Sequence, residues 1–432
     1  LSLVQAMASL SAAAGHLVAE ENGAPPELLL PEVPLSLDFH PHSEVLATGL
    51  IDGQIRVHRY HAEGHEEPFV SQAPAAADHS CRCLRFSSDG GLLIAGSADH
   101  SLSALAADGS LLWRAPDAHR DAVSALHVVG ENLVASGDDS GAVKLWDVRR
   151  GGTAIASVDD FQDYVSDFAH DPTQPETLLA SSGDGSVAAL DLRGRKSLGR
   201  SEELEEDILS IQIIRGGRKV LCGTSEGVLL IFTWGNWDGA TDSFPGHPQS
   251  IDAILKLDET TLLTGSSDGL IRVVGIQPNK LYGLVGDHGG FPIERMRWSA
   301  KRDLIGTISH DAVVRFWDVS YLHEDGEDEE GGDLHSAQAT VEGMDEEGAD
   351  HTSQEVLSAL RAHDQAVGPP TNGEDDEEGD WEDMDESDSD SDDGDRASAA
   401  ASSGGRADRG GGPQGRRAPK FQTQSERFFA DL

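Results

Sequence analysis

A short turn sequence recurs through the first three-quarters of the chain at a nearly constant spacing. Gly follows the first turn residue in five of the seven copies, which suits a hairpin turn that needs a positive φ. The first residues of the seven turns are Asp52, Asp99, Ser140, Asp184, Glu226, Asp268 and Asp311. Successive copies lie 41 to 47 residues apart, and this period restricts the chain to repeat architectures.

The residues around each turn predict four short strands per repeat. An apolar stretch that closes on small residues precedes the turn, as in Leu46–Gly49 and Val134–Gly137, and a β-prone run such as Val143–Trp146 follows it. Another apolar run, such as Leu35–Phe39, lies further upstream, and a weaker fourth strand is expected between repeats. Four strands in about 40 to 45 residues form one propeller blade, so the sequence predicts an all-β, seven-bladed β-propeller.

Two repeats carry a Trp-Asp dipeptide six residues past the turn, at Trp146-Asp147 and Trp317-Asp318. This pattern resembles the WD-repeat propellers, in which His, Ser or Thr, Asp and Trp form a buried hydrogen-bonded network in one blade. The resemblance implies structural roles for His119, His247, Asp268, Asp311 and Trp317. The other blades have His58, Leu105, Leu190, Phe232 and Val274 at the Trp position, and some of these blades are expected to rely on apolar packing.

The ring of a propeller must be closed, usually by an outer strand from one terminus. The third strand of the last repeat is predicted to end near Ser320, where acidic sequence follows at once. The closing strand is therefore expected to come from residues 15–33.

The net charge of −45 is concentrated near the C-terminus. Residues 324–395 contain 29 acidic residues and one basic residue, without apolar periodicity. Such a segment cannot bury enough surface to offset the entropy of ordering, so a disordered acidic tail is predicted. It is interpreted either as a solubilising segment or as a docking surface for basic client proteins. Ser387, Ser389 and Ser391 lie in its acidic run and are phosphorylation candidates.

These features predict four regions. They are an N-terminal segment at 1–24, the propeller at 25–322, the acidic disordered tail at 323–403, and a Gly/Arg-rich linker with an aromatic C-terminal motif at 404–432. Within the last region, Phe428 and Phe429 are expected to dock on a partner or on the propeller.

Several classes of function lack a signal in the sequence. No P-loop, dinucleotide fingerprint, nucleophile elbow or paired metal motif occurs, so the sequence predicts no enzyme, no cofactor and no metal site. No apolar run reaches the roughly 18 residues of a membrane span. Three cysteines are too few for a disulfide framework, which fits the nucleus or the cytosol. The acidic charge repels phosphates, so direct DNA binding is not expected.

Longer strings within residues 34–322 resemble the WD repeat-containing protein 55 family. Three of these strings are Leu133–Asp139, Asn236–Thr241 and Gly265–Arg272, and the chain end Ser425–Leu432 is similar to a motif in the family tail. The resemblance implies a protein of the nucleus and nucleolus, with the cytoplasm as an alternative, that supports ribosomal RNA production and ribosome assembly. Its implied role is that of a protein-interaction scaffold, whose partners are other proteins such as ribosome-assembly factors.

The sharpest local motif is Trp146-Asp147-Val148-Arg149. It resembles the W-D-x-R motif through which propellers dock on the adaptor of cullin-four ubiquitin ligases, and plant relatives resemble substrate receptors of such ligases. Arg149 follows the third strand of its blade, so it is expected on the face opposite the hairpin turns. The alternative interpretation is that Trp146 and Asp147 only build the blade and that Arg149 is a solvated charge.

Overall fold

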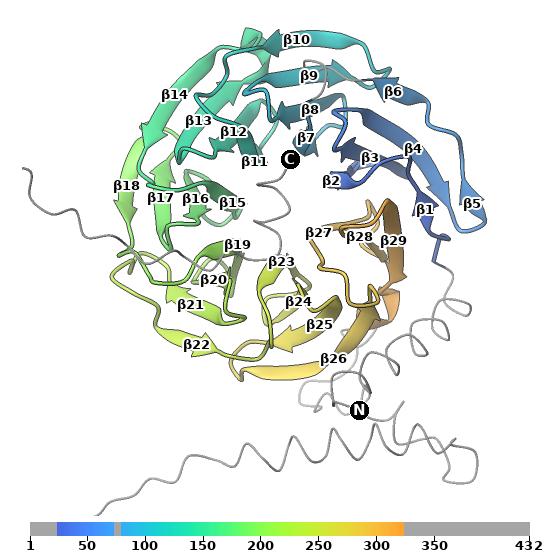
Figure 1. The fold of residues 1–432 in the computed structure, drawn as a ribbon. Helices are drawn as coiled ribbons and strands as arrows, with labels where there is room; N and C mark the ends of the chain where they lie inside the picture. Colours follow the sequence, from blue (N-terminus) through green and yellow to red (C-terminus); the bar gives the residue numbers. More distant parts are fainter. Residues whose placement is uncertain (1–23, 73–78, 324–432) are drawn as a thin grey trace, which may run out of the picture. The chain divides into compact units, whose positions relative to one another are not determined.

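The computed structural model describes residues 24–72 and 79–323, which form seven antiparallel sheets. The sheets follow one another in sequence order around a central axis, with the first strand of each sheet innermost (Figure 1). The predicted seven-bladed, all-β propeller is therefore confirmed. The tail residues Ser387, Ser389, Ser391, Phe428 and Phe429 lie outside the described residues.

The first three blades contain strands β2 to β14. Blade one consists of β2 (Pro34–Phe39), β3 (Val45–Leu50), β4 (Ile55–His61), β5 (Gly64–His65) and β6 (Val70–Gln72). Blade two consists of β7 (Cys81–Phe86), β8 (Leu92–Ser97), β9 (Leu102–Ala106) and β10 (Leu111–Ala115). Blade three consists of β11 (Val123–Val129), β12 (Leu133–Asp138), β13 (Ala142–Asp147) and β14 (Ala154–Asp159), with the 3-10 turn η1 (Val148–Arg150) after β13.

The next three blades contain strands β15 to β26. Blade four consists of β15 (Val165–His170), β16 (Thr177–Ser182), β17 (Val187–Asp191) and β18 (Lys196–Arg200). Blade five consists of β19 (Ile208–Ile214), β20 (Lys219–Thr224), β21 (Leu229–Thr233) and β22 (Asp242–Phe244). Blade six consists of β23 (Ile251–Lys256), β24 (Thr261–Ser266), β25 (Leu270–Gly275) and β26 (Lys280–Asp287).

Blade seven is completed by a strand from the other end of the propeller. It consists of β27 (Arg295–Trp298), β28 (Leu304–Ile308), β29 (Val313–Asp318) and β1 (Leu28–Leu29), and η2 (Ser320–Leu322) follows β29. β1 pairs antiparallel with β29, and the N–H of Leu30 donates to the carbonyl of Ala312 at 2.8 Å. The closing strand expected within residues 15–33 is thus confirmed.

The hairpin turns explain why the repeat depends on glycine. The Gly that follows the first turn residue has a positive φ in all five copies, for example +80° at Gly227. A Cβ at Gly227 would lie 2.4 Å from the carbonyl oxygen of His247, so a side chain would be strained there for two reasons. In blade two His100 adopts the same region, with φ 67°.

The core lies between neighbouring sheets. Blades four and five, for example, share a cluster in which Leu179, Ile211 and Phe232 are almost fully buried. Burial of each such side chain stabilises the fold by about 1.5–3 kcal/mol. Every blade must therefore have an apolar partner on each side, and a closed ring supplies one.

Two faces of the propeller follow from this topology. We call turn face the one formed by the seven hairpin turns between second and third strands and by the segments that join consecutive blades. We call opposite face the one formed by the remaining loops. Because consecutive strands of a blade are antiparallel, successive loops lie on alternate faces. The order of the strands along the chain therefore assigns each loop to one face.

Candidate functional site

The loops of the two faces differ in charge. The described loops of the turn face contain eighteen Asp and Glu residues and one basic residue, Arg120. Those of the opposite face contain thirteen acidic residues and eight Arg or Lys residues. The turn face therefore favours basic partners, while the opposite face offers cations for an acidic partner.

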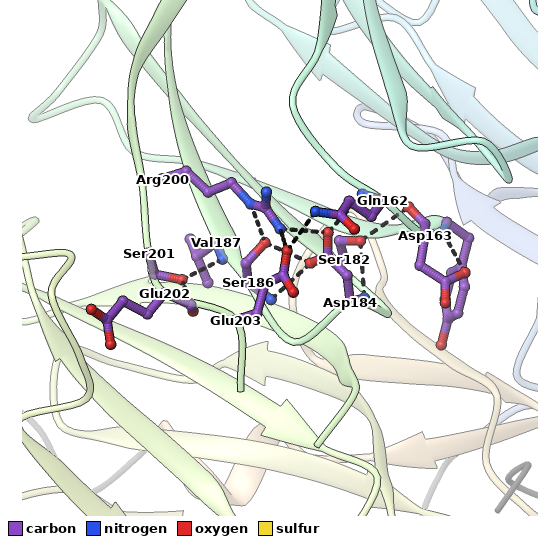
Figure 2. Close-up of polar contacts among 11 residues, drawn as sticks. Gln162, Asp163, Ser182, Asp184, Ser186, Val187, Arg200, Ser201, Glu202 and Glu203 are labelled. Carbon is purple, nitrogen blue, oxygen red and sulfur yellow. Dashed lines mark hydrogen bonds and ion pairs between the residues drawn. The ribbon is translucent and has the colours of Figure 1, made fainter. Parts of the chain in front are cut away.

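Arginine side chains neutralise part of the turn face. In blade four, the Asp184 carboxylate accepts from the Arg200 guanidinium at 2.7 Å, and Arg200 also donates to Glu203 at 3.0 Å (Figure 2). Arg114 pairs in the same way with Asp99 in blade two. The densest group of turn-face carboxylates lies in the segment 201–207, where five of seven residues are acidic.

The Trp146-Asp147-Val148-Arg149 motif lies at the end of β13 on the opposite face. Trp146 is buried, and its indole N–H donates to the Ser136 hydroxyl at 2.7 Å. Asp147 accepts the backbone N–H of Arg149 at 3.1 Å and so caps η1. The 3-10 turn places Arg149 in solvent, with 68% of its side chain exposed.

Asp147 also fixes the orientation of the Arg149 side chain. Nε of Arg149 donates to Oδ1 of Asp147 at 2.9 Å, and Nη2 donates to Oδ2 at 2.8 Å. The hydrogen bonds and charge of Arg149 lower the pKa of Asp147 to about 2. The pair presents a pre-oriented guanidinium whose Nη1 group makes no hydrogen bond to the described residues.

Blade seven repeats this architecture without the arginine. Asp318 follows Trp317, and its Oδ1 accepts from the backbone N–H of Ser320 at 2.9 Å and from its hydroxyl at 2.6 Å. Ser320 therefore occupies the position of Arg149. Blade four has the same cap without a tryptophan, since Asp191 accepts the backbone N–H of Arg193 at 2.9 Å. Of these three blades, only blade three combines the Trp-Asp dipeptide with the arginine.

His119 lies in a buried network at the centre of blade three. Its Nδ1 lies 2.8 Å from the Asp138 carboxylate and its Nε2 lies 2.5 Å from the Ser136 hydroxyl. These distances resemble those of a Ser-His-Asp hydrolase site. However, Ser136 is completely buried and also accepts the Trp146 indole N–H, so no substrate reaches its oxygen.

His247 and Asp268 belong to blade six but do not contact each other through a hydrogen bond. Nε2 of His247 lies 2.8 Å from the Thr264 hydroxyl, and Asp268 instead forms a bidentate ion pair with Arg272. Burial and the nearby Arg272 lower the pKa of His247 to about 4, so this imidazole is neutral at physiological pH.

Asp311 and Trp317 belong to the corresponding network of blade seven. Both His288 and the Trp317 indole bind the Thr307 hydroxyl, at 2.6 and 2.9 Å. Arg315 donates to Nδ1 of His288 at 2.9 Å and to Asp311 at 2.7 Å. An arginine thus stands between Asp and His here, whereas blade three joins them directly.

Charged residues of the inner strands were missed by the reasoning from sequence. Four arginines line the central channel, namely Arg82, Arg85, Arg295 and Arg297. Burial and the neighbouring Glu294 raise the pKa of the channel residue Asp252 to about 7. Polar residues within the otherwise apolar inner strands could have indicated these positions. The prediction of the blades was based on the turns and did not use them.

Two negative findings concern the described residues. Among them, no group of three or more His, Cys, Asp and Glu side chains is arranged to hold a metal ion. Their helices are all too short or too polar to cross a membrane.

Comparisons with known proteins agree on family and fold. A protein-family model described as WDR55 matches residues 25–322. WD repeat-containing protein 55 of Arabidopsis thaliana is 38% identical over 293 residues, which cover 67% of this chain and 81% of the relative. The human protein of that name is 35% identical over 301 residues, covering 69% and 77%. A chain in the crystal structure of the mitotic checkpoint complex shares the fold, with a TM-score of 0.60 at 15% identity, over 69% of this chain and 92% of that one.

Proposed function

The chain belongs to the WD repeat-containing protein 55 family, and from this membership we propose that it is a non-enzymatic scaffold that supports ribosomal RNA production and ribosome assembly in the nucleolus. The observation that carries the proposal is the match of the family model to the whole propeller, from residue 25 to residue 322. The WD-repeat fold of this family generally mediates protein–protein interactions, and ribosome-assembly factors are the partners proposed here.

The geometry supports a scaffold in two respects. The loops of the turn face are strongly acidic, while those of the opposite face are closer to neutral and carry almost all of the basic loop residues, so different partners can bind the same ring from its two sides. The Ser-His-Asp arrangement of blade three is sealed from solvent and holds the blade together.

Depletion of the protein tests this role. Ribosomal RNA precursors are expected to accumulate, and the tagged protein is expected to sediment with pre-ribosomal particles and to localise to the nucleolus. A rescue with the wild-type chain controls for off-target effects. Normal precursor levels after depletion, together with sedimentation as a free protein, would refute the proposal.

Arg149 favours a second candidate function, that of a substrate receptor of a cullin-four ubiquitin ligase. Its side chain is exposed and is pre-oriented by Asp147. A guanidinium held in this way can pair with a carboxylate or carbonyl of the ligase adaptor at a small cost in side-chain entropy.

A pull-down with the purified adaptor tests the second candidate. Arg149→Ala is expected to reduce recovery of the adaptor at least tenfold, because the charged hydrogen bonds to the adaptor can no longer form. Arg150→Ala is the matched control, since Arg150 is the exposed neighbour without a side-chain bond to Asp147. Equal recovery with all three proteins would exclude docking through Arg149.

A further inference from the structure

The cations of the opposite face are concentrated beside two tryptophans on blades four and five. We call this surface the basic–tryptophan patch. Its members are Arg193, Arg195, Lys196, Arg218, Trp234 and Trp237. The four basic side chains belong to exposed residues, and both tryptophans are partly exposed at the edge of the core.

Direct contacts join the two loops of blade five and bring blade four beside them. The backbone N–H of Trp234 donates to the carbonyl of Arg218 at 3.0 Å, which joins the two loops of blade five. The rings of Trp234 and Trp237 meet edge to face, with centroids 5.8 Å apart. A Cβ on Gly199 of β18 would lie 3.8 Å from Trp237, so blade four adjoins the tryptophan loop.

Rigid turns present these side chains. The Asp191 carboxylate accepts the backbone N–H of Arg193 at 2.9 Å and of Gly194 at 2.8 Å, and Arg195 has a φ of 57°. In blade five, Nε of Arg218 donates to the carbonyl of Arg215 at 2.9 Å. The loop of blade four is therefore ordered by backbone N–H groups, whereas in blade five the Arg218 guanidinium itself makes one of the contacts that order the loop.

The cations have little internal compensation. Arg193 pairs with Glu176 at 3.4 Å, but both side chains are more than 60% exposed, so the pair is weak. Within the described residues, no carboxylate forms an ion pair with Arg195, Lys196 or Arg218. In a chain with a net charge of −45, an uncompensated basic cluster is the surface most suited to an anionic ligand.

From this geometry we infer that the basic–tryptophan patch binds single-stranded RNA. Four cations spread over two blades match a phosphate backbone, and indole rings beside them offer stacking surfaces to unpaired bases. An acidic peptide would use the cations but would gain nothing specific from the two tryptophans. The acidic turn face repels RNA, so binding is restricted to one side of the ring. The inference is independent of the scaffold role proposed above.

Fluorescence anisotropy tests the inference on the full-length chain. The probe is a labelled polyuridine RNA of about 20 nucleotides, which is longer than the ~4–16 nucleotides that one compact single-strand site covers. The triple variant Arg193→Glu, Arg195→Glu and Lys196→Glu is expected to raise the Kd at least tenfold. The slope of log K against log salt is expected to fall by about 2, because each single-strand phosphate that the protein neutralises adds about 0.7 to this slope.

The control variant carries the same change of charge on other blades. Arg59→Glu, Lys280→Glu and Lys301→Glu alter exposed residues of blades one, six and seven. This control is expected to keep the wild-type salt slope, with a Kd that changes less than threefold. Equal loss of RNA binding in both triple variants would overturn the inference, because it would indicate only a general effect of charge.

Trp237→Leu separates stacking from electrostatics. It is expected to raise the Kd about fivefold or more without changing the salt slope, since a base loses its aromatic surface.

The thermal unfolding midpoint of each variant is measured first, and only variants within a few degrees of wild type are compared. A labelled glutamate-rich peptide of equal length serves as the competing ligand. If it binds as tightly as the RNA and Trp237→Leu leaves both Kd values unchanged, the patch is a site for acidic proteins and the inference is wrong.

Discussion

Blades three and five have the same four-stranded plan but different centres. In blade three, Trp146 and His119 meet at the Ser136 hydroxyl, and His119 also binds Asp138. In blade five, Phe232 takes the Trp position and packs among aliphatic side chains without a polar partner. One blade is centred on a hydrogen-bonded network and the other on an apolar core.

The fourth residue of the second strand differs between the two kinds of centre. The position of Ser136 is taken by Thr264 and Thr307 in blades six and seven, and each of these hydroxyls binds a buried histidine. In blade five the same position is Cys222, which is buried among apolar residues. The hydroxyl at this position thus binds a buried histidine in blades three, six and seven, and a nonpolar side chain permits the blade to do without the histidine. Blade one is an exception, because the buried hydroxyl of Thr48 has no hydrogen-bond partner among the described residues.

The largest expected effect comes from the apolar centre. Phe232→Ala should lower the free energy of unfolding by about 3–5 kcal/mol, because it leaves a cavity in a closely packed cluster. Chemical denaturation measures the change, and Phe232→Leu, which retains most of the volume, should cost less than half as much. A decrease below about 1 kcal/mol for Phe232→Ala would mean that blade five does not depend on packing at this residue.

Acid should affect the polar blades in a defined order. The pKa of His247 is about 4 in the folded state, below the ordinary value of 6.5, so the unfolded chain binds more protons between these values. Stability is therefore lost as the pH falls from 6.5 to 4, by up to about 3 kcal/mol for this residue. Hydrogen bonds from His119 and Ser140 lower the pKa of Asp138 to about 2, so blade three loses its contribution only below about pH 4.

Denaturation curves at about pH 7, 5 and 4, which span this interval, measure the difference. His247→Gln keeps a hydrogen-bonding group near Thr264 but does not titrate, so its stability should vary less with pH than that of the wild type. The Phe232→Leu variant serves as the control and should keep the wild-type pH dependence. Identical pH dependence in His247→Gln and wild type would show that His247 does not cause the loss.

Asp138→Asn should weaken the network by about 2 kcal/mol, because a charged hydrogen bond to the buried His119 is replaced by a neutral one. The free energy of unfolding at neutral pH measures the change. Asp147→Asn is the control, since this carboxylate lies at the surface and caps η1. If both variants lose the same amount, the buried network contributes no more than a surface cap.

The sequence predicted the architecture well because the repeat determines it. Seven turns at a constant period define seven blades, and the acidic sequence after Ser320 required a closing strand from the other end, which β1 supplies. The centres of the blades were harder to predict. Asp268 and Asp311 bind Arg272 and Arg315 rather than histidine, because an arginine four residues after the turn competes for the carboxylate. The pattern Asp-x-x-x-Arg was present in the sequence, but strand geometry was needed to interpret it.

The smallest expected effect comes from exchanging the Trp position between the two blades. Trp146→Phe gives blade three the aromatic residue of blade five and should cost about 1 kcal/mol, mainly from the missing hydrogen bond to Ser136. Adding Ser136→Cys, as at Cys222, isolates the Trp146–Ser136 interaction in a double-mutant cycle, and a positive coupling is expected. Additive effects would mean that Ser136 serves His119 alone. The Trp-Asp dipeptide would then contribute to blade three through the volume of its ring and not through its N–H group.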